Sequence, residues 1–482
     1  MKIILAGYNL DINLLQDYKT ISGEVLTPET ISSAYARISR YSKSVDELRR
    51  LSIHNITKAR NSNQRIIFEM GHSSIAEHSV FNFDLIGISR YITEFIQRSR
   101  LVSFTEKSQR YITLYGDFVL PPELVNYPIK QNFINTIEQQ NQTYLYLYDK
   151  LKEYFRRTLC NNYTRRAVDE KAKQDARYVV CLSTETQMGI TINARNLERL
   201  LKRLFACGLT EGKIIADKMY NQVKNIAPSL VRYIIPSEFD KRNSNFCYSN
   251  FKAKEGNIES IFHHAKNVQL LDYDEDGDDK ILSAILFRNS YNGFQKIKEN
   301  LRNKSVAEKK ELFKEILQEI KSFDPVPREF ELADFTFQIL CSASCFAQLK
   351  RHRMSTIISA PYHPDFGYTI PQSIEKIDEK KKFIEIMNVT NETFYKIQDI
   401  FPRVAPYILT NAHRRSVIFK LNVRELYHFS RLREDTHSQW EIRNIAEQIV
   451  RICKDKLPLS TMLVCGKDQF ENIYSGLYGS TL

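Results

Sequence analysis

Residues 81–100 read FNFDLIGISRYITEFIQRSR and combine two kinds of hydrophobic pattern. Over the first part apolar and polar side chains alternate, with Phe81, Phe83 and Leu85 on one face, which predicts a half-buried strand. The apolar residues then recur at helical spacing, which predicts a helix that ends on two arginines. The stretch therefore predicts a strand that runs directly into a helix with cations at its end.

The same pattern occurs again in the second half of the chain. DFTFQI (334–339) alternates in the same way, and a helical apolar face follows it up to RHR (351–353). Further along each half, TINARNLERLLKRL (191–204) matches KLNVRELYHFSRLR (420–433). These pairs predict an internal duplication, because self-similarity within one chain marks repeated structural units.

The duplication sets the expected domain boundaries. At 482 residues the chain is too long for one ordinary core, so we expect two domains, 1–240 and 263–482, joined by a polar linker at 241–262. The matched landmarks are 24 residues further apart in the first copy, which predicts an insertion in the helical stretch around 124–175. VQLLDYD predicts the first strand of the second copy near residue 268.

Charge and composition limit the class of partner. A net charge of +12, from 69 Lys and Arg against 57 Asp and Glu, favours anionic partners such as nucleotides, phosphorylated cofactors or nucleic acid. No secretory signal is visible and no apolar run reaches the roughly 20 residues of a membrane helix, so we expect no membrane partner. The eight cysteines form no C-x-x-C pair, which predicts a reduced, cytoplasmic protein.

One acidic segment imitates a metal site. DYDEDGDD (272–279) has the spacing of the first ligands of an EF-hand calcium loop. Ser283 stands where that loop needs a bidentate carboxylate, and Lys280 stands where a ligand or water belongs. The segment therefore predicts an acidic turn at a helix start, and we expect no metal.

Five segments together resemble the flavin-dependent thymidylate synthases, the ThyX family. They are GHSSIAEH (71–78), RSRLVSFTEKSQRY (98–111), INARNL (192–197), RHR (351–353) and LNVRELYHFSRLREDTHSQWEIR (421–443). The resemblance covers most of both halves, and the combination of segments is far more specific than a lone Arg-His-Arg.

The resemblance implies a fold and an activity. It implies an α+β protein with two tandem ThyX-like domains, each a mixed sheet with packed helices, forming an internal pseudo-dimer. It also implies conversion of dUMP to dTMP, with methylenetetrahydrofolate as carbon donor and NADPH-reduced FAD as hydride source. Because family members are homotetramers, we expect a homodimer of this two-domain chain, a pseudo-tetramer, with small-molecule ligands and no nucleic acid partner.

Each family nucleotide site is shared between two subunits, and each copy here keeps one share. Copy two keeps Gln348, Arg351 and Arg433, whereas copy one keeps Glu106, Lys107, Ser108, Gln109, Arg110 and Arg177. Copy one lacks the family histidine, with Ser99 at the position of His352, and it has Leu204 at the position of Arg433. Copy two has Ser359, Pro361, His363 and Pro406 at the positions of the copy-one set. The pattern predicts one complete site assembled from both copies, whose mirror image cannot form.

The resemblance also assigns a flavin site. Its expected residues are Ser74, Glu106, Asn193, Arg195, Arg351, His352, Arg353, Asn422, Arg424 and His428. For the nucleotide, a spacing of two predicts that Glu106, Ser108 and Arg110 face the same way on an extended segment. Arg351 and Arg110 are the candidates for binding the phosphate, because the planar guanidinium of arginine can form two parallel hydrogen bonds to an oxyanion. The alternative is a solvated basic strand end, since arginine clusters usually lie at the surface.

Arg433 is the expected catalytic residue. It replaces Leu204 of copy one on an inward apolar helix face, where a guanidinium needs an anionic or polar partner. The resemblance implies that this partner is the uracil ring, whose developing negative charge Arg433 would stabilise. An internal salt bridge is the alternative. His437, one turn beyond, can face the same cavity, although a lone histidine at such a place is more often a structural hydrogen-bonding group than a catalyst.

Two other functions fit part of the sequence. A decayed paralogue would bind nucleotide or flavin in a regulatory or structural role, but random decay would not spare complementary halves of one site. A nucleic-acid-binding protein would use the positive charge with interleaved aromatic residues. The basic clusters lie instead at repeated helix ends, which favours small anionic ligands.

Overall fold

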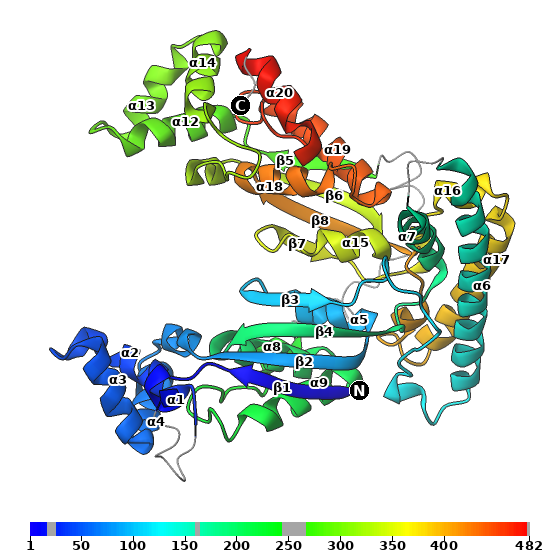
Figure 1. Cartoon of the computed structure of the whole chain (residues 1–482), viewed down its shortest axis with the longest axis horizontal. Coiled ribbons are helices and arrows are strands. Elements are labelled where there is room, and N and C mark those ends of the chain that lie inside the picture. The colour runs from blue at the N-terminus through cyan, green and yellow to red at the C-terminus, as the bar shows by residue number, and fades with distance from the viewer. Residues whose placement is uncertain (17–25, 160–163, 243–266, 480–482) are drawn as a thin grey trace. The chain divides into compact units, whose positions relative to one another are not determined.

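The computed structural model describes residues 1–16, 26–159, 164–242 and 267–479. The chain forms two compact units. Unit 1 comprises Met1–Lys254 and Pro371–Thr410, and unit 2 comprises Glu255–Ile370 and Asn411–Leu482. Each unit has a four-stranded sheet with packed helices, which confirms the α+β class (Figure 1). The linker predicted at 241–262 lies, from residue 243 onward, outside the described residues.

Unit 1 contains the elements of copy one together with a helical segment of copy two. Its strands are β1 (Lys2–Tyr8), β2 (Val80–Ser89), β3 (Val102–Glu106) and β4 (Glu185–Asn193). Its helices are α1 (Ile12–Gln16), α2 (Glu29–Arg37), α3 (Val45–His54), α4 (Ile56–Gln64), α5 (Arg90–Gln97), α6 (Ile129–Thr158), α7 (Arg165–Ala176), α8 (Ala194–Ala206), α9 (Thr210–Val223), α16 (Gln372–Lys376) and α17 (Lys380–Gln398). Its short turns are η1 (Ile38–Arg40), η2 (Arg65–Glu69), η3 (Ser73–His78), η4 (Pro122–Leu124), η5 (Arg177–Val179) and η8 (Ala405–Ile408).

Unit 2 contains the remaining elements of copy two. Its strands are β5 (Val268–Tyr273), β6 (Asp334–Ser342), β7 (Thr356–Ser359) and β8 (Arg414–Asn422). Its helices are α12 (Gly277–Arg288), α13 (Phe294–Arg302), α14 (Val306–Leu317), α15 (Ala343–Leu349), α18 (Val423–Arg433), α19 (Trp440–Lys456) and α20 (Phe470–Tyr478). Its short turns are η6 (Arg328–Leu332), η7 (Pro364–Phe366) and η9 (Lys467–Gln469).

The two sheets have the same topology, which confirms the duplication. Their strand orders are β1-β2-β4-β3 and β5-β6-β8-β7. Every pairing between these strands is antiparallel, so the expected mixed sheet is wrong. Copy one has one extra bulge in β2 at Gly87, which adopts φ +72°. A Cβ there would lie 3.0 Å from the backbone nitrogen of Met1, so glycine suits both the φ angle and the close approach.

Both copies fix the junction between strand and helix in the same way. Ser89 caps α5 by accepting a hydrogen bond from the N–H of Ile92, and its own N–H and hydroxyl donate to buried Glu211. Ser342 caps α15, and it donates to buried Glu441 through the same two groups. The serine cap ends the strand and starts the helix that leads to the arginine segment.

One segment of copy two packs in unit 1, so the compact units differ there from the sequence copies. Helix α17 lies against α6, and buried polar side chains join the two helices. The Nε2 atom of Gln140 donates to the hydroxyl of Thr390 at 2.8 Å and to the carbonyl of Ile408 at 3.0 Å. Thr136 and Thr393 share a hydrogen bond of 2.8 Å. The extra length of copy one lies in α6, which has 30 residues against 19 in α17, and in the additional helix α7.

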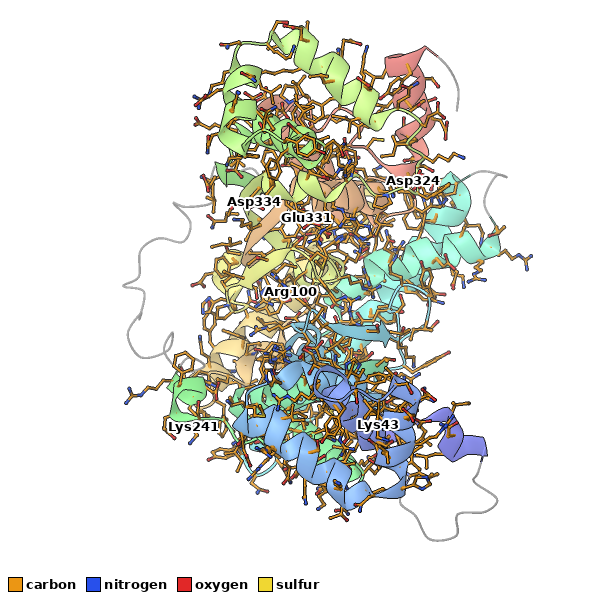
Figure 2. All side chains as sticks on the ribbon, turned by 90° about the vertical axis from the view of Figure 1, so that its left-hand side faces the viewer. Lys43, Arg100, Lys241, Asp324, Glu331 and Asp334 are labelled. Atoms are coloured by element: carbon orange, nitrogen blue, oxygen red, sulfur yellow. The ribbon has the colours of Figure 1, made fainter. Side chains whose placement is uncertain are left out.

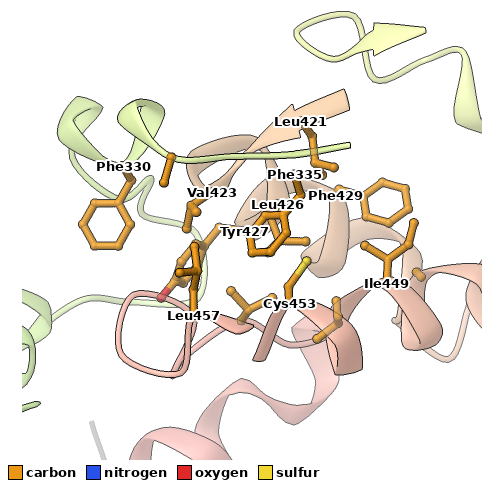
Figure 3. Packing of buried hydrophobic residues seen from close by; sticks show 14 of the residues in the cluster. Phe330, Phe335, Leu421, Val423, Leu426, Tyr427, Phe429, Ile449, Cys453 and Leu457 are labelled. Atoms are coloured by element: carbon orange, nitrogen blue, oxygen red, sulfur yellow. The ribbon is translucent and has the colours of Figure 1, made fainter. Parts of the chain in front are cut away.

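The core of unit 2 lies on the helical face of its sheet. Phe335 on β6 and Leu421 on β8 pack with the inner faces of α18 and α19 (Figure 3). Leu426 and Phe429 are both fully buried in this cluster. The core therefore fixes the helix whose last residue is Arg433.

Charged side chains pair across the outer ends of the elements. Glu331 and Asp334 lie near the start of β6 (Figure 2), where Asp334 pairs with Lys420 at 3.0 Å. The acidic turn before α12 is neutralised by lysines, with Asp276 contacting Lys298 and Lys280. No helix in the described part of the chain is both long and apolar enough to cross a membrane.

Candidate functional site

The copy-two residues of the expected nucleotide site lie together in unit 2. Gln348 is buried near the end of α15, and its side-chain amide lies 3.5 Å from the Oε1 atom of Gln439. Arg351 and Arg353 follow in an exposed turn, with His352 buried between them. The turn therefore presents two arginines to solvent and one histidine to the interior.

Arg433 ends helix α18 beside this turn. Its Nε atom donates to Nε2 of His352 at 2.8 Å, and its Nη2 atom donates to the carbonyl of Gln348 at 3.2 Å. The side chain is half-buried. The structure thus brings Gln348, His352 and Arg433 into contact.

A buried carboxylate lies behind His352. Oε1 of Glu425 is 3.2 Å from Nδ1 of His352, and both side chains are buried. Burial, and then the charges of Arg433 and His428, hold the pKa of His352 well below its usual value. Burial also raises the pKa of Glu425.

The copy-one residues leave the sheet at the end of β3. The strand stops at Glu106, and the hydroxyl of Ser108 accepts a hydrogen bond of 3.2 Å from the N–H of Arg110 in the turn that follows. The prediction that Glu106, Ser108 and Arg110 face the same way on an extended segment is therefore wrong. Lys107 is exposed, and Gln109 is buried beneath the turn.

Three guanidinium groups and one carboxylate gather behind this turn. Glu106 accepts hydrogen bonds from Arg90 and, at 2.9 Å, from Gln97. Arg177 follows α7 and is 4% exposed. Burial, with a smaller contribution from the charges of Arg110 and Arg90, lowers the pKa of Arg177 to about 10. A bound anion would relieve the mutual repulsion of these cations, which suits a phosphate site.

At the matching place in copy two, a different guanidinium stabilises the loop. Arg415 donates through Nε to the carbonyl of Ala360 at 2.8 Å, and its guanidinium lies over the rings of Phe346 and Tyr362. His363 stands at the position that corresponds to Arg110 of copy one, and it pairs with Asp365 at 3.2 Å. This loop is therefore held by contacts within unit 2.

In copy one the position of His352 is taken by Ser99. Nη2 of Arg203 donates to the Ser99 hydroxyl at 2.6 Å. Leu204, at the position of Arg433, is fully buried in the core. In copy one the cation is therefore Arg203, one residue earlier on helix α8, and the position of Arg433 is an apolar core residue.

The asparagines and arginines expected at the flavin are positioned alike in both copies. Asn193 and Asn422 are the N-caps of α8 and α18, accepting from the N–H groups of Asn196 and Glu425 at 2.9 and 2.8 Å. Arg195 pairs with Glu77, and Arg424 pairs with Glu331 at 3.0 Å. Both asparagines therefore have a structural role in starting the helix that carries the arginine.

Ser74 opens into a cavity of about 600 Å³ in unit 1. The cavity combines apolar walls with polar and cationic groups. Its lining includes Ile38, Val45, Arg40, His72, Ser74 and His78. Turn η3, which carries Ser74, packs against α8 and Arg195. Among the residues that the structure describes, none accepts a hydrogen bond from the buried Nε atom of Arg195.

Two histidines near the copy-two site are exposed. His428 lies on α18 with its ring centroid 5.7 Å from that of His352. The side chain of His437 is 92% exposed and bonds to Asp435 at 2.8 Å. The expectation that His437 faces the same cavity as Arg433 is wrong, because α18 ends at Arg433 and the helical spacing does not continue.

Comparison with known proteins identifies the family. A family model described as thymidylate synthase complementing protein matches residues 23–229 and 269–459. The chain belongs to this family. Because the two matched regions fall in the two halves, it is a tandem-domain member, as the duplication predicts.

Individual relatives match either most of the chain or less than half of it. Over 88% of its length the chain is 23% identical to a UPF0159 protein of Thermoplasma acidophilum, covering 93% of that protein. A UPF0159 protein of Chlamydia pneumoniae is also 23% identical, over 88% of this chain and 87% of its own length. A flavin-dependent thymidylate synthase of Clostridium tetani is 29% identical, over 44% of this chain and 83% of its own length.

Sequence reasoning missed the residues that support the site from behind. Glu425, Gln439 and Glu441 are all buried, and each bonds to a residue of the α15 segment or the turn after it. One signal was available for Glu425. Copy one has Asn196 at its position, so Glu425 is present only in the copy that also has His352 and Arg433.

Proposed function

We propose that this chain is a flavin-dependent thymidylate synthase. It converts dUMP to dTMP with methylenetetrahydrofolate as carbon donor and NADPH-reduced FAD as hydride source. Both copies contribute to one nucleotide site, copy two through Gln348, Arg351 and Arg433. The share of copy one comprises Glu106, Lys107, Ser108, Gln109, Arg110 and Arg177.

The observation that carries the proposal is the complementary retention of the two half-sets. In unit 1 Arg110 and Arg177 are close enough for their charges to interact, and in unit 2 Arg433 contacts Gln348 and His352. The matching positions of the opposite copy hold buried Leu204 in one case and His363 in the other. Loss that spares one full set of partners is expected when a single working site is under selection.

The chain's own residues supply binding and charge stabilisation in this proposal. Arg110, Arg177 and Arg351 hold the nucleotide phosphate, because guanidinium groups match oxyanions with two parallel hydrogen bonds. Arg433 donates to the uracil ring and stabilises negative charge that develops at N3 and the adjoining carbonyl. Carbon 5 thereby becomes nucleophilic without a covalent bond to the enzyme.

The residues around Ser74 fit a flavin dinucleotide. The cavity there has apolar walls for a ring system and has Arg40 and two histidines for an anionic portion. None of the described residues accepts a hydrogen bond from the buried Nε of Arg195, so this donor is available to a ligand. A bound flavin would supply the hydride. Ser74, Arg195 and Asn193 in copy one would hold it, with Arg351, His352, Arg353, Asn422, Arg424 and His428 contributed by copy two.

An absorption spectrum tests the proposal directly. The purified chain is expected to carry a yellow flavin chromophore that bleaches when NADPH and dUMP are added together. Addition of methylenetetrahydrofolate should then produce dTMP and restore the colour. A colourless preparation that makes no dTMP when FAD is supplied would refute the proposal.

The second candidate is a paralogue that binds flavin or nucleotide without turnover. One observation favours it, namely that Arg195 and Arg424 already pair with Glu77 and Glu331 within the chain. Such a protein would show bound flavin, or tight dUMP binding, and no dTMP under the same conditions. The two candidates therefore separate in one experiment.

A further inference from the structure

Two buried side chains, Glu425 and His352, form a chain of contacts that ends at the half-buried Arg433. Glu425 is 7% exposed and His352 is 2% exposed, and they lie between the core of unit 2 and the guanidinium. The contacts run from Oε1 of Glu425 to Nδ1 of His352 at 3.2 Å, and from Nε2 of His352 to Nε of Arg433 at 2.8 Å.

The chemistry of the donors fixes the tautomer of His352. The Nε atom of arginine can only donate, so Nε2 of His352 must accept and carries no proton. The ring proton of neutral His352 is then on Nδ1, where it is donated to the Glu425 carboxylate. Protonation of both nitrogens would set an N–H of His352 against the N–H of Arg433.

The surroundings hold Glu425 and His352 in this arrangement. Glu425 lies in the first turn of α18, and its N–H donates to the Asn422 cap at 2.8 Å. The ring of His352 packs edge-on against that of Phe429 at a centroid distance of 4.9 Å. A second contact, from Nη2 of Arg433 to the carbonyl of Gln348, fixes the plane of the guanidinium.

Copy one provides a comparison within the same chain. The positions of Glu425, His352 and Arg433 are occupied there by Asn196, Ser99 and Leu204. All three members are thus absent together from the copy that lacks the guanidinium. This joint difference is expected if the three side chains act as one unit.

We propose that Glu425 is a positioning residue that acts through His352 to orient Arg433 toward the bound pyrimidine. This role rests on the proposed function of Arg433. It requires neither contact between Glu425 and a ligand nor a change in its charge during the reaction. Its effect on turnover passes entirely through the imidazole.

A double-mutant cycle tests the turnover effect. Glu425→Ala should lower kcat about 10- to 100-fold while the KM for dUMP changes little, because a misdirected catalytic group costs rate rather than binding. Glu425→Gln, whose amide oxygen can accept from Nδ1, should recover most of the rate. In a His352→Ala background, Glu425→Ala should add almost nothing. If the rate losses of the two single variants multiply in the double variant, the proposal is overturned. The exposed Glu447→Ala on α19 serves as the control.

A spectroscopic measurement separates this proposal from the proposed function. In protein labelled with ¹⁵N-histidine, long-range proton–nitrogen spectra report the tautomer of each ring, and His352→Asn identifies the relevant signal. We expect the proton on Nδ1 in the wild type and a weaker preference in Glu425→Ala, where only the Arg433 donor still acts on the ring. A proton on Nε2 in the wild type would contradict the proposal. If the protein is inactive but shows the expected tautomer, the arrangement proposed for Glu425 and His352 holds, and only the proposed synthase activity is refuted.

Discussion

The guanidinium carbon of Arg415 lies 4.0 Å from the centroid of the Tyr362 ring. The same group is 4.6 Å from the ring centroid of Phe346, so two aromatic rings contact a cation that is 4% exposed. These cation–π contacts hold the loop that, in copy two, corresponds to the residues around Arg110. Copy one has Thr186 at the position of Arg415 and therefore has no such clamp.

Removal of Tyr362 is expected to destabilise unit 2. Tyr362→Ala takes away a buried ring and one of the two cation–π contacts of Arg415, and should lower the unfolding free energy by about 3 kcal/mol. Thermal unfolding followed by calorimetry measures the effect. Tyr291→Ala is a suitable control because Tyr291 is fully exposed, and it should leave the transition almost unchanged. Equal changes in unfolding free energy for the two variants would show that the Tyr362 ring contributes nothing to stability.

Arg110 is expected to bind the nucleotide through its phosphate. Arg110→Ala should weaken dUMP binding by about tenfold or more, because a charge-assisted hydrogen bond contributes roughly 1.5–3 kcal/mol. Binding of deoxyuridine, which has no phosphate, should change much less. Titration calorimetry with both ligands checks this, with Arg166→Ala as control since that side chain is 84% exposed. Unchanged affinity for dUMP would exclude a phosphate contact.

Arg433 is expected to be essential for turnover, whereas the mirror position is not. Arg433→Ala should abolish dTMP formation because it removes the group that stabilises charge on the uracil ring. His363→Arg, which restores one arginine to the incomplete half-set, should leave the rate nearly unchanged. Steady-state rates of both variants give the comparison. An Arg433→Ala variant that forms dTMP at the wild-type rate would rule out the proposed site.

Glu434 is expected to make stability depend on pH. Burial, opposed by its hydrogen bond from Ser430, raises the pKa of Glu434 to about 7. A raised carboxyl pKa stabilises the folded state below the unfolded value near 4.5, and this contribution is lost as the pH rises through about 7. Glu434→Gln should therefore gain stability relative to the wild type between pH 5 and pH 8.

Thermal unfolding at the two pH values measures that gain. The amide keeps the size and neutrality of the protonated carboxyl, so the difference between variant and wild type should grow as the pH rises. The exposed Glu471→Gln on α20 provides the control. A difference that stays constant from pH 5 to pH 8 would mean that Glu434 is already ionised in the folded protein.

Local pattern was sufficient to predict the repeated elements of the fold. The alternation over Phe81, Phe83 and Leu85 predicts β2, and all three residues are fully buried or nearly so. The strand-to-helix switch after it holds in both copies because a capping serine, Ser89 or Ser342, stands at the junction. Periodicity reports which face of an element is buried, and burial is what stabilises these elements.

Tertiary partners could not be predicted in the same way. The buried face of α17 fits any apolar partner, so the sequence did not show that this partner is α6. The same limit explains the errors at the site. The spacing of Ser108 and Arg110 assumes that β3 continues beyond Glu106, and the spacing of His437 assumes that α18 continues beyond Arg433. Both elements end where backbone and side chain bond to each other locally.

Because α17 packs on α6, the protein cannot be cut between its two repeats without separating two packed helices. A truncated product that ends near residue 240 would expose the amide of Gln140 and the hydroxyl of Thr136 on an apolar surface stripped of Thr390 and Thr393. Reconstitution from two separately expressed halves would therefore require the second fragment to supply that helix.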